Sequence, residues 1–72
     1  MRKGEKQMTL GKYLKKAREK KGLSVRELAK LVGVAHTTIY KYETDEHEPR
    51  ISHLKWIAQA LNLSLTELIE RI

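Results

Sequence analysis

One predicted helix carries four polar side chains on the same face. The helix begins near residue 35 and ends near residue 42, and the residues are His36, Thr37, Tyr40 and Lys41. Lys41 can donate to guanine O6 and N7, Thr37 can bond a base edge or touch a thymine methyl, and His36 offers a donor and an acceptor. Tyr40 suits a phosphate as well as a base. These residue types favour contact with base edges in the major groove of a duplex, although an ordinary solvated helix face is also polar.

A shorter helix that precedes this face has clear start and stop signals. The Ser24 hydroxyl can accept a hydrogen bond from the Glu27 backbone N–H, and the Glu27 carboxylate can accept one from the Ser24 N–H, which is a capping box. Gly33 stands where a helix ends in a left-handed conformation. The apolar stripe of this helix is predicted to be Leu28, Ala29, Leu31 and Val32. A tight turn then leads to the second helix, which carries Ile39 and Tyr42 inward.

This arrangement resembles the helix-turn-helix of the XRE type, the class of phage Cro and repressor proteins. The resemblance runs from about residue 9 to residue 69 and is carried by GLS at 22–24, ELA at 27–29, GV at 33–34, TI at 38–39, KYE at 41–43, Pro49, Ile51, Leu54, Ile57–Ala58, Ala60–Leu61 and the segment 63–68. It implies an all-α fold, a compact five-helix lambda-repressor-like DNA-binding domain. It also implies that the four outward residues occupy the base-reading positions of the recognition helix.

The resemblance implies further roles outside that face. Arg18 is expected to form a structural ion pair with Glu43, tying the first helix to the recognition helix. If that pair is buried, loss of one partner strands the other charge. The expected phosphate contacts are Arg18, Lys21, Thr38 and Arg50.

Three departures from the family pattern concern the DNA backbone. Val25 stands where relatives often have a glutamine that bonds a phosphate, and Ala35 is a poor cap for the recognition helix. The loop 44–50 is acidic where relatives usually carry basic or small residues. Its carboxylates would repel phosphates within about 10 Å at 0.1 M salt. We therefore expect fewer side-chain contacts with phosphates, or contacts made by other residues of the chain. The acidic loop is expected to point away from the DNA, to weaken DNA binding, or to contact a basic partner.

The rest of the chain is predicted to complete the core and to offer a contact surface. Leu10, Tyr13, Leu14 and Ala17 form the apolar face of a first helix, and a fourth helix is expected from Ser52 to Leu61, with Asn62 as its left-handed cap. A second capping box, Ser64 with Glu67, opens a short fifth helix. Trp56 faces outward, either as a partner contact or packed on the arm or first helix. Candidate dimer or partner contacts are Trp56, Thr66 and Glu67.

Composition limits the class of protein. The 72 residues carry a net charge of +6 and no cysteine, so we expect one domain at 9–72 after a flexible arm at 1–8, with no disulfide. Residues 1–30 hold 11 Lys/Arg and 3 Glu, a charge of +8, whereas residues 31–72 hold 4 Lys/Arg and 6 Asp/Glu, a charge of −2. This asymmetry favours a polyanionic partner. The sequence shows no membrane span or signal peptide, so a cytoplasmic protein is expected.

Function is predicted from these features together. The first hypothesis is a transcriptional regulator, a repressor, that binds a palindromic double-stranded operator as a homodimer. The alternative is a protein-interaction module, antitoxin-like or an adaptor, that keeps the fold and has weak DNA affinity. Salt dependence of binding separates the two. The cluster at Glu46, His47, Glu48 and His53 matches no standard metal spacing, so we expect no metal, no cofactor and no enzymatic activity.

Overall fold

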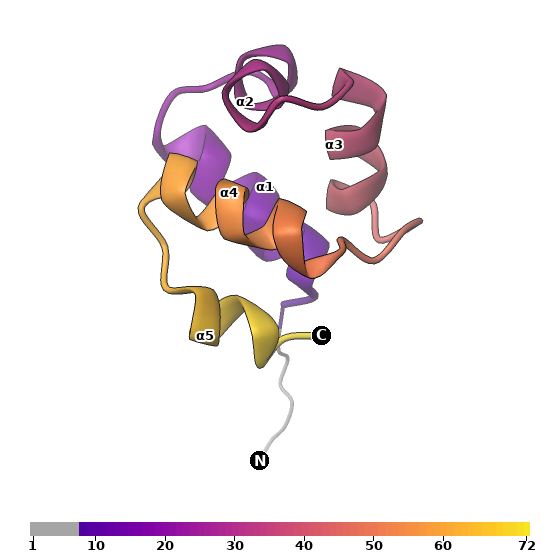
Figure 1. Ribbon diagram of the computed structural model, residues 1–72, viewed down its shortest axis with the longest axis vertical. Helices are drawn as coiled ribbons and strands as arrows, with labels where there is room; N and C mark the ends of the chain where they lie inside the picture. Colours follow the sequence, from indigo (N-terminus) through magenta and orange to yellow (C-terminus); the bar gives the residue numbers. More distant parts are fainter. Residues whose placement is uncertain (1–7) are drawn as a thin grey trace.

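The computed structural model describes residues 8–72, and over these residues the chain forms five α-helices and no strand (Figure 1). Residues 1–7 of the predicted arm lie outside the described part. The helices are α1 (Leu10–Lys20), α2 (Val25–Val32), α3 (His36–Glu43), α4 (Ile51–Leu61) and α5 (Leu65–Ile69). The all-α five-helix prediction is confirmed. None of the described helices has the length and apolarity needed to cross a membrane.

Local side-chain and backbone signals set the ends of the helices. The Ser24 hydroxyl accepts from the Glu27 N–H at 3.0 Å and the Glu27 carboxylate accepts from the Ser24 N–H at 2.7 Å, so the predicted capping box is confirmed. Gly33 ends α2 with φ of 86°, and Asn62 ends α4 with φ of 57°. Both residues adopt the left-handed conformation predicted for them.

Every helix contributes a fully buried side chain to a single core. The largest of these are Leu14, Leu28, Ile39, Leu54, Ile57 and Leu68. The helix α3 packs against α1 and α2, while α4 packs against α2 and α5. Helices of five to eleven residues are marginal in isolation, so this shared core supplies most of their stability.

Leu31 does not belong to the buried stripe of α2, which corrects the sequence prediction. Its side chain is 62% exposed, whereas Leu28, Ala29 and Val32 are buried. Leu31 precedes Val32 by about 100° of helical rotation. The stripe that α3 and α4 cover is too narrow to include it.

Two further expectations need correction at the C-terminal end. The fourth helix begins at Ile51, one residue earlier than predicted. The Ser64 hydroxyl accepts from the Glu67 N–H at 3.4 Å, but the Glu67 carboxylate accepts from the Tyr13 hydroxyl at 3.0 Å rather than from Ser64. The second capping box is therefore half formed, because a partner on α1 takes the carboxylate. That hydrogen bond raises the pKa of Tyr13, and Arg71 lies 4.0 Å above the Tyr13 ring.

Candidate nucleic-acid interface

A buried ion pair joins the inward face of α3 to α1. Arg18 Nε donates to Glu43 Oε2 at 2.6 Å and Nη2 donates to Oε1 at 3.1 Å, so the ion pair is bidentate. Arg18 Nη1 also donates to the Leu23 carbonyl at 2.6 Å. Both side chains are buried, and the hydrogen bond that Arg18 donates to Glu43 raises the pKa of Arg18. The pair expected from the family resemblance is present, and it fixes α3 relative to α1 and to the segment leading into α2.

A second contact, which the sequence did not predict, holds the end of α3 against the start of α1. Asp45 has a positive φ of 63°, and its carboxylate accepts from the Gly11 N–H at 2.9 Å and from the Thr9 hydroxyl at 2.6 Å. A Cβ on Gly11 would lie 2.5 Å from the Tyr42 carbonyl and 2.6 Å from the Glu43 carbonyl. The two helices approach so closely here that only glycine fits.

The acidic loop is partly engaged within the protein. Asp45 bonds to α1 as described, and Glu46 accepts a hydrogen bond from the Thr44 hydroxyl at 2.8 Å. Glu48 and Arg50 are exposed. Two of the three loop carboxylates therefore have partners in the chain itself, which limits their freedom to turn toward a phosphate backbone.

The outward face of α3 is exposed along its whole length. All four predicted base-reading side chains are accessible to solvent: His36, Thr37, Tyr40 and Lys41. Thr38 is half-buried, and the Ala35 side chain makes no cap hydrogen bond. The helix thus presents donors and acceptors on one face while Ile39, Tyr42 and Glu43 are buried on the other.

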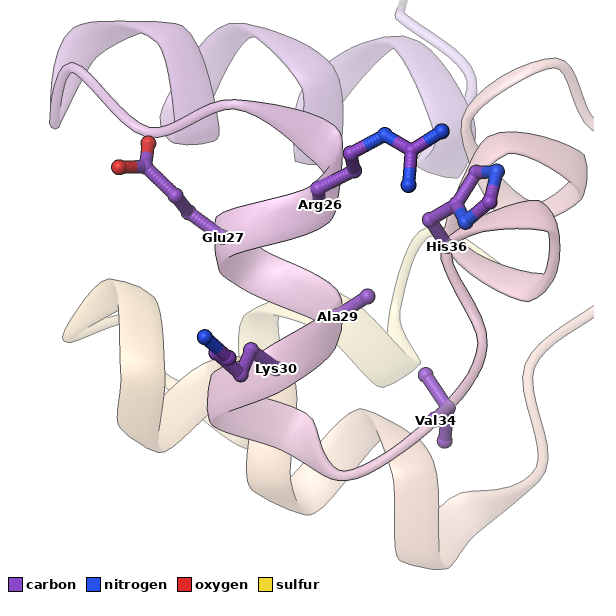
Figure 2. A pocket seen from close by; sticks show the side chains of 6 residues that line it. All are labelled: Arg26, Glu27, Ala29, Lys30, Val34 and His36. Carbon is purple, nitrogen blue, oxygen red and sulfur yellow. The ribbon is translucent and has the colours of Figure 1, made fainter.

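Two basic hollows adjoin the outward residues of α3. The first holds about 410 Å³ and reaches His36; its walls are Arg26, Glu27, Ala29, Lys30 and Val34 (Figure 2). The second holds about 340 Å³ and reaches Tyr40; its walls are Lys12, Lys15, Arg18, Val25, Glu43 and Thr44. Val25 itself offers no hydrogen bond, but Lys12 and Lys15 lie along the same hollow. From sequence, no role was assigned to Lys12, Lys15 or Arg26, and their position beside α3 was not predicted.

The remaining candidate positions are spread over other elements. Lys21 is exposed at the end of α1 and Arg50 is exposed at the start of α4. Thr66 and Glu67 are exposed on α5, with Glu67 bonded to Tyr13. Within residues 8–72, no group of three or more His, Cys, Asp or Glu side chains could hold a metal ion.

Trp56 belongs to a short aromatic series that begins in the core. The Tyr42 hydroxyl lies 2.6 Å from His53 Nδ1, and the rings of His53 and Trp56 are 6.1 Å apart. Burial raises the pKa of Tyr42. Trp56 remains 47% exposed beside His53, a neighbour on its own helix.

The fold and this site define the class of protein. Two helices joined by a tight turn at Gly33 are braced by three others, and the second of the two exposes a polar face. This is the arrangement of a helix-turn-helix domain.

Comparison with known proteins agrees with this class. The helix-turn-helix family model HTH_3 matches residues 14–68, so the chain belongs to the helix-turn-helix regulators of the XRE type. It is 40% identical over 57 residues to the HTH-type transcriptional regulator PuuR of Escherichia coli, a match covering 79% of this chain and 31% of PuuR. The matches cover 12% to 49% of the length of the curated relatives.

Solved structures with the same fold include proteins bound to DNA. The biofilm regulator SinR in complex with DNA has a TM-score of 0.79 and 31% identity, covering 85% of this chain and 98% of that one. The P22 c2 repressor with a synthetic operator has a TM-score of 0.82 and 29% identity, covering 86% of this chain and 94% of that one. SinR has also been solved with SinI, at a TM-score of 0.80 and 30% identity, covering 86% of this chain and 61% of the matched one.

Proposed function

We propose that this chain binds a specific double-stranded DNA operator and represses transcription, with α3 in the major groove. The observation that carries the proposal is the division of α3 into a buried face bonded to α1 and an exposed face of four polar side chains. Helix-turn-helix proteins read bases with the second helix while the first crosses the DNA backbone.

In this proposal one set of side chains on and around α3 contacts the bases, and another set contacts the phosphates. His36, Thr37, Tyr40 and Lys41 contact base edges. Phosphates are held by Lys21, Thr38 and Arg50. Arg18 contributes the guanidinium N–H groups that its hydrogen bonds to Glu43 and Leu23 do not use. The DNA complexes of SinR and the P22 c2 repressor support this assignment, because they share the fold.

The proposed active form is a homodimer in the cytoplasm on a palindromic operator. One eight-residue helix covers only a few base pairs, so two copies would read half-sites about 34 Å apart. Trp56, Thr66 and Glu67 are the proposed contacts with a second copy or a partner protein. The SinR–SinI complex supports a partner as a second use of this fold.

A selection experiment tests the proposal. The protein is incubated with a random pool of duplexes, and the bound fraction is sequenced over several rounds. We expect one enriched site with two-fold symmetry, and affinity for it that falls linearly with salt on logarithmic axes. Failure to enrich any site, with no binding of random duplex at low salt, would contradict the proposal and favour the protein-interaction module, which the half-exposed Trp56 supports.

A further inference from the structure

The hollow between α2 and the first residue of α3 brings two donor side chains together from different helices. Figure 2 shows the Arg26 guanidinium extending toward the His36 ring, while Glu27 and Lys30, which also line the hollow, extend away from that ring. Both Arg26 and His36 are exposed, so a ligand can reach them.

Glu27, which lines this hollow, is already hydrogen-bonded within the protein. Its carboxylate accepts from the Ser24 backbone N–H at 2.7 Å as part of the capping box. The positive charge of Arg26 therefore faces His36 rather than a carboxylate. An anion between them would find a guanidinium fork on one side and an imidazole N–H on the other.

We propose that Arg26 and His36 together hold one backbone phosphate of the bound duplex, at the entrance of α3. The inference rests on the proposed DNA-binding function and deepens it. The side chain of the neighbouring residue, Val25, has no polar atom with which to bond a phosphate, and Arg26 supplies a side-chain contact from the next position on α2. A phosphate fits better than a base, because the first helix of the motif crosses the backbone. Only one ring nitrogen of His36 is used, which leaves the second for a base edge.

The test compares Arg26→Ala with Lys30→Ala on the selected duplex. The two variants lose the same charge from the same helix and the same hollow, but Lys30 extends away from His36 (Figure 2). For Arg26→Ala we expect, for each half-site bound, about tenfold weaker binding and a salt slope smaller by about 0.9, uniformly across sequences. Lys30→Ala should weaken binding less than about threefold. Both positions are exposed, so both melting temperatures should stay near that of the wild type.

Neutral methylphosphonate linkages then locate the contact. In the wild-type complex, neutralising one particular phosphate should weaken binding by about tenfold. The same linkage should have a smaller effect on Arg26→Ala, in which only His36 remains, and on His36→Ala, in which only Arg26 remains, whereas its effect on Lys30→Ala should match that on the wild type.

Two results overturn the inference while the proposed function stands. Arg26→Ala could change the preferred base at one position with an unchanged salt slope, which would make Arg26 a base reader. Arg26→Ala and Lys30→Ala could instead weaken binding equally, with no phosphate specific to Arg26. If the wild type binds no duplex at all, the proposed function fails first and the inference fails with it.

Discussion

The two faces of α3 differ in what holds their side chains. On the inward face, Glu43 bonds to Arg18, Tyr42 lies 2.6 Å from His53, and Ile39 is fully buried. On the outward face, the four polar side chains extend into solvent. The inward face therefore determines where the helix lies, and the outward face is free to determine what it binds. Substitutions on the two faces should separate accordingly into losses of stability and losses of recognition.

The inward face is fixed to α1 at two places that differ in kind. In the C-terminal half of α1 the contact is the buried ion pair of Arg18 with Glu43. At the start of α1 the backbones approach closely at Gly11, whose N–H donates a hydrogen bond to the Asp45 carboxylate. Together they set the angle at which α3 presents its outward residues. Because a displacement of either contact would move the whole polar face, both are expected to matter for binding as well as for folding.

The largest predicted loss of stability follows from breaking the charge pair. Glu43→Gln keeps the size of the side chain but leaves Arg18 buried beside a neutral group, so the free energy of unfolding should fall by about 3–5 kcal/mol. Urea titration followed by circular dichroism measures the change. The exposed Glu48→Gln in the loop between α3 and α4 is the control and should stay within about 0.5 kcal/mol of the wild type.

A double variant shows whether the loss comes from the stranded charge. Replacing both partners by apolar residues, Arg18→Met with Glu43→Leu, should recover most of the stability that Glu43→Gln loses. If Glu43→Gln costs less than about 1 kcal/mol, the pair does not hold α3 in the way that its geometry indicates.

A smaller loss is expected where the backbones of α1 and α3 meet. Alanine normally stabilises an exposed helix interior relative to glycine by about 0.5–1 kcal/mol. At Gly11 the added Cβ would lie 2.5 Å from the Tyr42 carbonyl, so Gly11→Ala should instead destabilise the protein by about 1–3 kcal/mol. Urea titration measures the change, and we expect a lower midpoint concentration for Gly11→Ala than for the wild type. A more stable Gly11→Ala protein would mean that the two helices are not in close contact there.

Features with a local signal were predictable from sequence. The Ser24–Glu27 capping box and the left-handed residues Gly33 and Asn62 depend on neighbours within a few positions. The inward orientation of Ile39 and Tyr42 follows from helical spacing alone. The Arg18–Glu43 pair spans 25 residues and was expected only through the family resemblance.

Contacts without a local signal were missed. Asp45 and Gly11 are 34 residues apart, and neither residue type indicates a partner. Glu67 looked like the second member of a capping box, but Tyr13, 54 residues away, competes for its carboxylate. In the sequence, nothing distinguishes Arg26 from the other basic residues, and only the folded structure shows that it lies beside His36. Distant contacts depend on how the helices cross, which spacing along the chain does not specify.

Lys41→Ala tests most directly whether the outward face of α3 reads DNA sequence. Lys41 is exposed, so the melting temperature should stay near that of the wild type. Selection from a random duplex pool should show a relaxed preference at one base position per half-site, and affinity for the wild-type site should fall by about 1–3 kcal/mol for each half-site. A Lys41→Ala protein that selects the same sequence with undiminished affinity would contradict the assignment of this face to base recognition.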